Sequence, residues 1–191
     1  MEFRIHDSTS VSVTGDVDLM ATSYVSLQGD LSISGQLNNQ GNSDNFILLS
    51  DAFSTGSLIV QGSITGDHTI ERYLSSSTWH FLSPSVDNLT TSVFYYNGLP
   101  WTYAAYFDEP TSSWIFLPGT NDAMPLGRGY KFWLGEVKSS VTAQMRGPLI
   151  STDLAVNLSN VNSSWNLIGN PFPSAINWNQ GAWGGNTNGT V

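Results

Sequence analysis

Cysteine is absent from the 191 residues of this chain, and charged residues are scarce. Without cysteine there is no disulfide cross-link, no thiol nucleophile and no cysteine-based zinc site. Charged residues make up 11% of the chain, against about 25% in an average soluble domain. No stretch approaches the roughly 18 consecutive apolar residues of a membrane-spanning helix. We therefore expect no membrane insertion.

Basic residues are the rarer of the two charged classes: six Lys and Arg stand against 15 Asp and Glu, a net charge of −9. Nucleic-acid binding needs a basic face, so the sequence predicts no such partner. Oxygen-rich loops can bind calcium, and the best runs for it are 16–18, 42–45 and 121–122. None has the spacing of a known calcium loop, and their side chains also suit turns. We expect no cofactor, with calcium as the alternative.

The composition changes sharply near residue 70. Residues 5–71 contain no Lys, Arg, Trp or Pro, whereas all seven Trp lie at or after Trp79 and all eight Pro at or after Pro84. This break predicts two architectures, one over residues 1–70 and the other over residues 71–191.

The first part carries a short repeat. An apolar, polar, Gly, polar, apolar pattern occurs within residues 12–17, 26–31, 33–37 and 60–64. Short alternating strands with a recurring Gly are typical of β-solenoid coils, each of which buries its apolar side only by stacking on its neighbours. The sequence thus predicts a Gly-rich, β-solenoid-like segment; an ordinary sheet with Gly bulges is the alternative.

The second part predicts many short strands and no helix. The candidate segments are aromatic or β-branched, and turn signals such as Asn97-Gly98 and Pro118-Gly119 separate them. They cover residues 69–74, 79–82, 93–96, 101–107, 114–117, 130–134, 141–145, 154–158 and 165–168. This spacing is typical of an antiparallel β-sandwich, so the predicted fold class is all-β throughout.

Three stretches of the second part carry a family resemblance. They are Glu71-Arg72-Tyr73-Leu74 leading into Trp79-His80-Phe81-Leu82-Ser83-Pro84, then Leu126-Gly127-Arg128-Gly129-Tyr130, and finally Trp165-Asn166-Leu167-Ile168-Gly169-Asn170-Pro171-Phe172-Pro173-Ser174-Ala175-Ile176-Asn177-Trp178. In this order they resemble a repeated module of large, adhesin-like multidomain proteins of the Bacteroidota, which are commonly cargo of type IX secretion. The resemblance implies an extracellular or cell-surface location, further domains in a parent chain and no particular activity. It also implies a fragment that is truncated at its C-terminal end.

These motifs also have a purely structural interpretation. Gly127 and Gly129 suit a tight turn that feeds the strand beginning at Tyr130, and the two prolines of the third stretch would end a strand in a rigid corner. We expect Trp165 and Trp178 to cover the core on either side of that corner. The whole structural set is Trp79, Gly127, Gly129, Tyr130, Trp165, Asn170, Pro171, Pro173 and Trp178.

Catalytic patterns are hard to find in this sequence. The three histidines show no metal-ligand spacing, and there is no Gly-x-Ser-x-Gly elbow or phosphate-binding Gly loop. His80 is expected to face away from Trp79 and Phe81 as a hydrogen-bonded histidine. Asp108-Glu109, the only adjacent acidic pair, precedes a proline and suits a turn better than a glycosidase site. We therefore predict that the chain is not an enzyme.

Carbohydrate binding is the main alternative to a structural role. Exposed aromatic rings stack on pyranose rings, and the candidate ligand-binding residues are Trp101, Tyr103, Tyr106 and Trp114. Trp101 and Tyr103 would share one strand face, with Tyr106 on the other. An aromatic stripe is more often core than binding site.

Three functions follow from these features. We expect first a non-catalytic structural or adhesin-like module that extends or presents other domains. The alternatives are a carbohydrate-binding module and an accessory domain of a secreted hydrolase. The partners would be polysaccharide, other surface proteins or the remaining domains of the parent chain.

Overall fold

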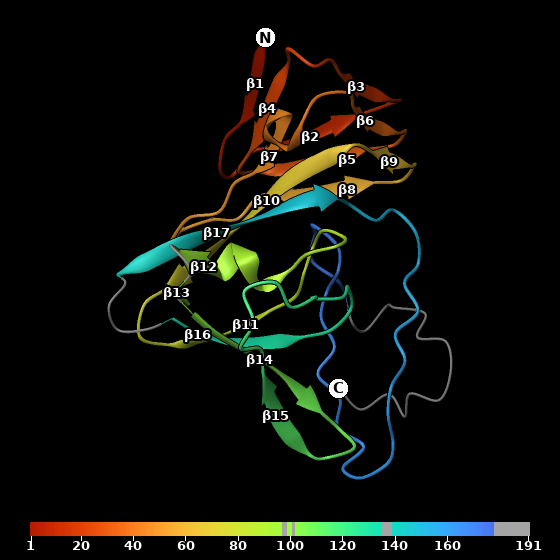
Figure 1. Ribbon diagram of the computed structural model, residues 1–191. Helices are drawn as coiled ribbons and strands as arrows, with labels where there is room; N and C mark the ends of the chain where they lie inside the picture. The colour runs from red at the N-terminus through yellow and green to blue at the C-terminus, as the bar shows by residue number, and fades with distance from the viewer. Residues whose placement is uncertain (97–98, 101, 135–138, 178–191) are drawn as a thin grey trace.

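A computed structural model describes residues 1–96, 99–100, 102–134 and 139–177 of the chain. It is all-β, with 45% strand and 4% helix. Figure 1 shows a stack of β-coils at the N-terminal end and an antiparallel sheet beyond it. The predicted fold class, a β-solenoid-like segment followed by antiparallel structure, is thereby confirmed.

The solenoid has about three turns. Each turn contributes one strand to each of three parallel sheets, in the orders β1-β4-β7, β2-β5-β8 and β3-β6-β9. The strands are β1 (Glu2–Ile5), β2 (Ser10–Val13), β3 (Val17–Leu19), β4 (Tyr24–Leu27), β5 (Asp30–Ile33), β6 (Leu37–Asn39), β7 (Phe46–Leu48), β8 (Ser57–Val60) and β9 (Ile64–Thr65). Their inward residues form the core, because alternate side chains point to the same face of a strand.

Successive turns differ in length. Val13, Ile33 and Val60 are stacked partners, so the steps are 33 − 13 = 20 and 60 − 33 = 27 residues. The longer step holds the 3-10 helix η1 (Ser43–Asn45) and a loop over residues 51–54. These insertions explain the irregular spacing of the sequence repeat.

The recurring glycine lies at one corner of each turn. Gly35 donates its N–H to the Gly15 carbonyl and Gly62 donates to the Gly35 carbonyl, both at 3.0 Å. A side chain on Gly35 would overlap the Gly15 backbone, so only glycine allows this close approach. Gly29, which the sequence pattern aligned with Gly15, instead lies between β4 and β5 at a different corner.

One strand joins the two parts of the molecule. β10 (Asp67–Ser75) pairs in parallel with β7 and, along its whole length, antiparallel with β17 (Ser140–Pro148). The result is a five-stranded sheet in the order β1-β4-β7-β10-β17. Ile70 partners both Leu48 of the solenoid and Met145 of β17, and all three belong to one hydrophobic core. The composition boundary at residues 70/71 therefore falls inside a shared strand.

A second, four-stranded antiparallel sheet completes the fold. Its order is β11 (Trp79–Leu82), β16 (Tyr130–Leu134), β14 (Thr102–Asp108) and β15 (Ser113–Phe116). Its inner face buries Ala104, Tyr130, Phe132 and Leu134. The ring of Phe132 lies 4.6 Å from that of Phe94, which belongs to the 3-10 helix η2 (Thr91–Phe94). The remaining hairpin is β12 (Tyr95–Tyr96) with β13 (Leu99–Pro100).

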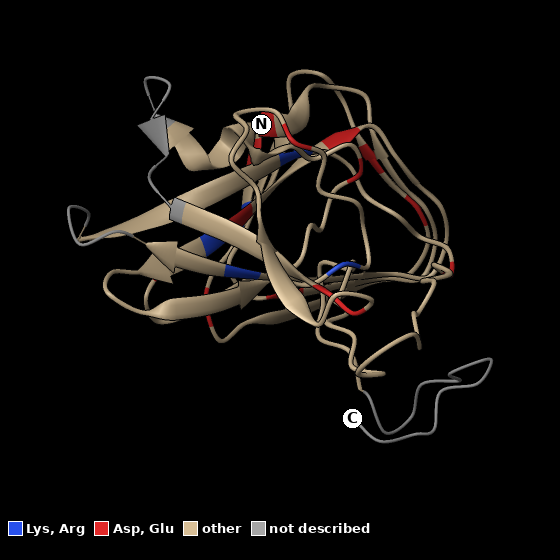
Figure 2. Ribbon diagram, turned by 60° about the horizontal axis from the view of Figure 1, so that its bottom comes forward, with Lys and Arg blue, Asp and Glu red and all other residues tan. Residues whose placement is uncertain are grey.

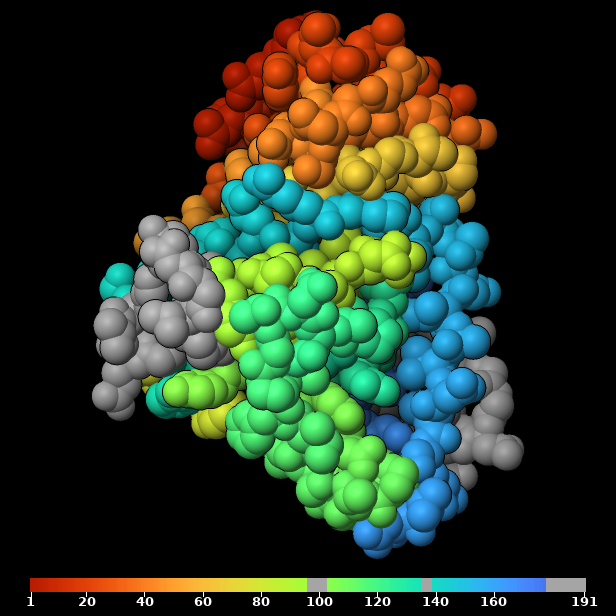
Figure 3. All heavy atoms as spheres, in the orientation of Figure 1, coloured from red at the N-terminus to blue at the C-terminus, as the bar shows by residue number. Residues whose placement is uncertain are grey.

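Three predicted strands differ from the structure. Residues 93–96 divide between η2 and β12, while residues 154–158 and 165–168 form no ladder. The latter segment is held by a single bridge between Arg128 and Ile168. Figure 3 shows this C-terminal described part, in blue, running down one side of the molecule. Side-chain contacts replace the missing ladder: Leu154 and Val156 occupy the space that a side chain at Gly127 would need.

An aromatic face on the antiparallel sheet

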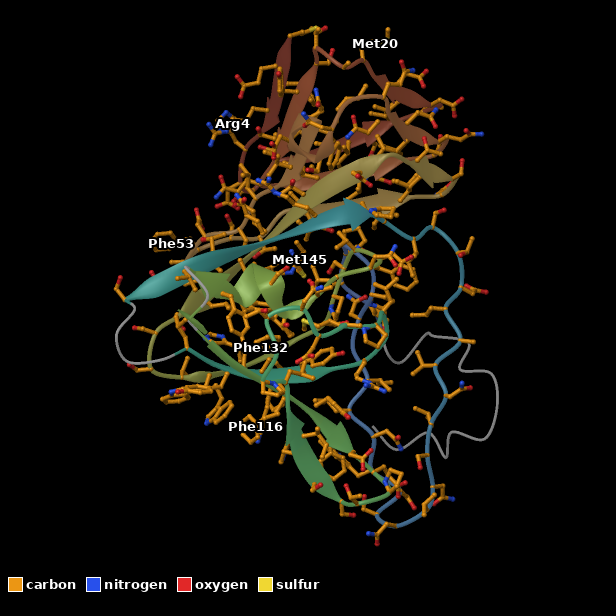
Figure 4. All side chains as sticks on the ribbon, in the orientation of Figure 1. Arg4, Met20, Phe53, Phe116, Phe132 and Met145 are labelled. Carbon is orange, nitrogen blue, oxygen red and sulfur yellow. The ribbon has the colours of Figure 1, made fainter. Side chains whose placement is uncertain are left out.

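The outer face of the four-stranded sheet exposes a row of aromatic rings. Trp133 of β16 is the register partner of Trp79 on one side and of Tyr103 on the other. Phe81 follows Trp79 by two residues and Phe116 lies at the opposite edge of the sheet, both on this same face. Trp79, Phe81, Tyr103 and Phe116 are 47%, 68%, 57% and 53% exposed. Figure 4 shows Phe116 below the sheet, on the side away from Phe132. We call these five side chains the aromatic face.

The rings enclose a shallow hollow of about 250 Å³, lined by Trp79, Tyr103, Phe116 and Trp133. The rings of Trp79 and Trp133 lie 5.3 Å apart and are tilted by 51°. Because the two rings are tilted, they do not form one coplanar platform.

Lys131 lies at the centre of the aromatic face. Its Nζ is 3.8 Å from the centroid of the Trp114 ring, 4.9 Å from that of Trp79 and 5.7 Å from that of Phe116. The ring faces attract the ammonium group electrostatically. The strands of this sheet carry only one acidic residue, Asp108 at the end of β14. Figure 2 shows how few Lys and Arg residues, in blue, the described part of the chain carries. The face is thus locally cationic in a chain of net charge −9.

The predicted sugar-binding residues are only partly brought together. Tyr103 is on the aromatic face, and Trp114 lies half-buried on the same side beneath Lys131. Tyr106 is on the inner face, packed against the core with its ring 6.4 Å from that of Tyr130. The prediction that Tyr106 belongs to the sugar-binding surface is therefore corrected. Trp101 lies outside the described residues.

Sequence reasoning missed four members of the aromatic face: Trp79, Phe81, Phe116 and Trp133. The sequence signal for them was the alternation in Trp79-x-Phe81, Trp114-x-Phe116 and Lys131-x-Trp133, which places each pair on one strand face. What the sequence did not reveal is that β11 and β16 are neighbours.

The three motif stretches converge on a second feature, a groove beside the sheet. Gly129 donates to the Leu167 carbonyl at 3.0 Å and Gly169 donates to the Gly127 carbonyl at 2.9 Å. Gly169 also lies so close to Ser83 that any side chain would overlap it. The groove has a volume of about 320 Å³. Its lining includes Arg72, Phe81, Ser83, Ser85, Gly129, Ile168, Asn170 and Phe172.

The Asn-Pro-Phe-Pro stretch is held in a bend by hydrogen bonds of Asn170. Asn170 donates from Nδ2 to the Ser174 carbonyl at 2.6 Å, and its Oδ1 accepts from the Phe172 N–H at 2.9 Å. Pro171 and Pro173 are buried. The Pro173 carbonyl accepts from the N–H of Leu58 at 3.1 Å, which fastens the corner to the solenoid strand β8.

The structure describes only one of the two tryptophans that were expected to cover the core at this corner. Trp165 was expected over the core, but it is 48% exposed and packs edge-on against Phe107, with centroids 4.5 Å apart. Its ring is also 6.2 Å from that of Trp114. Trp165 therefore extends the outer side of the sheet instead of covering the core. Trp178 lies outside the described residues.

The acidic pair Asp108-Glu109 does not form a shared site. Asp108 accepts from the hydroxyl of Thr111 in a turn. Glu109 is buried, and its carboxylate accepts from the Ser159 hydroxyl at 2.6 Å and from three backbone N–H groups, those of residues 161, 162 and 164. The Ser159 hydroxyl and these N–H groups lower the pKa of Glu109 to about 2. Glu109 thus fastens the loop over residues 159–164.

His80 and the oxygen-rich runs have structural partners. The Nε2 of His80 lies 2.9 Å from the Ser75 carbonyl. In the calcium candidates, Asp16 accepts from the Gln36 N–H, and Asn42 caps η1. Asp122 accepts from the Gly119 N–H in a turn. Across the described ranges, no three His, Asp or Glu side chains gather closely enough to hold a metal ion.

Comparisons with protein-family models, curated proteins and solved structures gave no match to this chain. Among the residues that the structure describes, no helix has the length and hydropathy needed to cross a membrane.

Proposed function

We propose that this chain is a non-catalytic, glycan-binding module of a secreted or cell-surface protein, in which the solenoid supports the aromatic face. The observation that carries this proposal is the row of exposed rings around Lys131. Contiguous apolar surface of this kind usually marks an interaction site. The apolar C–H faces of pyranose rings pack well against such rings, whose two torsion angles lose little entropy on binding.

The geometry of the face favours a single glycan chain as the ligand. The 51° tilt between Trp79 and Trp133 means that the rings are not coplanar, which suits a separate polysaccharide chain better than a flat crystalline surface. The rings stand on β11, β14, β15 and β16 and not on loops. Sites on regular elements hold their geometry more accurately than sites on loops.

A purely structural module is the second candidate, and a different observation favours it. Because β10 belongs to both the solenoid and the antiparallel part, the two share one sheet and one core. Such a joint suits a rigid spacer that presents neighbouring domains of a parent chain, in line with the resemblance of the three motif stretches. In that case the aromatic face would contact another domain or another surface protein.

Binding to a panel of polysaccharides tests the proposal. The full chain is titrated with neutral and acidic polysaccharides, with and without calcium, and tryptophan fluorescence and affinity electrophoresis are recorded. The test variant is Trp79→Ala. The matched control is Phe53→Ala, which removes a 94% exposed ring from the solenoid side.

We expect saturable binding that Trp79→Ala weakens by about tenfold or more, since a stacked ring is worth about 1.4 kcal/mol. Phe53→Ala should bind like the unmodified chain. No binding across the panel, or equal losses in the two variants, would overturn the glycan proposal in favour of the structural one.

A further inference from the structure

The groove beside the aromatic face contains a cation without an acidic partner. Arg72 lines the groove, and its Nη1 donates to the Glu71 carbonyl at 2.8 Å. Within the described part of the chain the ion pair found joins Arg146 to Asp44, and none involves Arg72. The guanidinium group has five donor hydrogens in a planar fork, so it retains the capacity to bind a carboxylate.

Burial makes the isolated charge of Arg72 costly. The side chain is only partly exposed, and burial lowers the pKa of its guanidinium. A charged group held away from water without a counter-ion is destabilising. An anionic ligand group in the groove would remove this cost and would gain charge-assisted hydrogen bonds.

Phe81 connects the groove to the aromatic face. Its ring, 68% exposed, lines the groove together with Arg72. On the sheet, Phe81 is the register partner of Lys131, the cation at the centre of the aromatic face. Phe81 therefore lies between the groove that Arg72 lines and the strand that carries Lys131, and Lys131 also has no acidic partner among the described residues.

We propose that the glycan recognised by this chain is an acidic one, whose uronate carboxylate is bound by Arg72 in the groove while adjoining sugar rings pack along Phe81 and Trp79. The inference rests on the proposed glycan-binding function and adds its chemical class. A carboxylate is favoured over a sulfate ester because its planar, two-oxygen edge matches the guanidinium fork.

The central comparison is between two polymers that share one galacturonan backbone and differ in whether its carboxylates are free or methyl-esterified. Polygalacturonate, its fully methyl-esterified form and dextran sulfate are titrated against the full chain, and a neutral glucan is added as a reference. The test variant is Arg72→Gln, which keeps a polar stem of similar length but removes the charge. Arg4→Gln is the matched control, because Arg4 is an exposed arginine on β1 at the far end of the solenoid.

We expect polygalacturonate to bind at least about tenfold more tightly than its methyl ester, and this preference to weaken at high salt. Arg72→Gln should abolish the preference and leave binding of the neutral glucan unchanged, while Arg4→Gln behaves like the unmodified chain. Circular dichroism and the thermal midpoint show whether each variant is folded. If Arg72→Gln does not fold, the proposal is tested on the unmodified chain alone. The two measurements are then its relative affinity for the acid and the methyl ester, and the salt dependence of its binding.

The contrary outcomes separate the two proposals. Equal binding of the acid and the ester would overturn the acidic-glycan inference and leave the glycan-binding function standing. Preference for dextran sulfate over polygalacturonate would overturn the assignment of a carboxylate. Absence of binding to every polymer would overturn both proposals.

Discussion

His68 makes the stability of this protein depend on pH. Its side chain is fully buried on β10, with its ring 5.3 Å from that of Phe46 in an edge-on contact. Neither ring nitrogen has a hydrogen-bond partner. Burial lowers the pKa of His68 to about 4, although the nearby Gly66 backbone and Asp67 carboxylate oppose this shift.

The sign and size of the effect follow from proton linkage. The pKa of His68 is about 4 in the folded state and 6.5 in the unfolded chain, so only the unfolded chain is largely protonated between these values. Stability is therefore highest above pH 6.5 and falls as the pH drops towards 4. A difference of about 2.5 units corresponds to roughly 3 kcal/mol, a large part of the stability of a typical domain.

Denaturant unfolding at several pH values between 7 and 4 measures this loss, with tryptophan fluorescence as the signal. His68→Leu is the test variant, since leucine has a similar volume, does not titrate and leaves no unpaired nitrogen. We expect the unmodified chain to lose about 3 kcal/mol more than the variant over this range. Parallel stability curves for the two proteins would refute the reasoning.

Further predictions concern three particular contacts. Glu109→Gln leaves one carbonyl oxygen where two carboxylate oxygens accept four hydrogen bonds, so we expect faster proteolysis within residues 159–164. In the unmodified chain the same loop should open as the pH falls from about 4.5 towards 2, because the pKa of Glu109 is lowered; pH-independent cleavage would count against this. Gly35→Ala should cost about 1–3 kcal/mol of unfolding free energy through overlap with the Gly15 backbone, and an unchanged denaturation midpoint would contradict it. Ile70→Ala should cost about 2–5 kcal/mol in a single cooperative transition, whereas two separate transitions would show that the two parts do not share one core.

Much of the fold follows from local patterns in the sequence. The strands at 79–82 and 130–134 were predicted with the observed bounds, because aromatic residues at alternate positions favour a strand locally. The segments 154–158 and 165–168 are also rich in apolar residues but form no ladder, since a strand also needs a neighbouring strand of suitable length. The presence of such a neighbour depends on distant parts of the chain, so the local periodicity of the sequence does not predict it.

The candidate site was less predictable for the same reason. Tyr103 and Trp114 were identified from composition, but the face they share depends on the order β11-β16-β14-β15. Glu109 was expected in a turn, and its partners lie at least 50 residues further along the chain. Gly15 and Gly35 show the limit most clearly: the repeat predicted a solenoid, but its pattern aligned Gly15 with Gly29, whereas in the structure Gly35 stacks on Gly15.

The most direct test of the account is to locate the bound glycan by nuclear magnetic resonance. The indole N–H signals of the ¹⁵N-labelled chain are followed during titration with an oligogalacturonate, with Trp79→Phe and Trp133→Phe used for assignment. We predict saturable shifts that are largest at Trp79 and Trp133, while the backbone amides of the solenoid remain unchanged. Saturable shifts confined to the solenoid, or no shift at these two indoles, would contradict the claim that the aromatic face is the binding site.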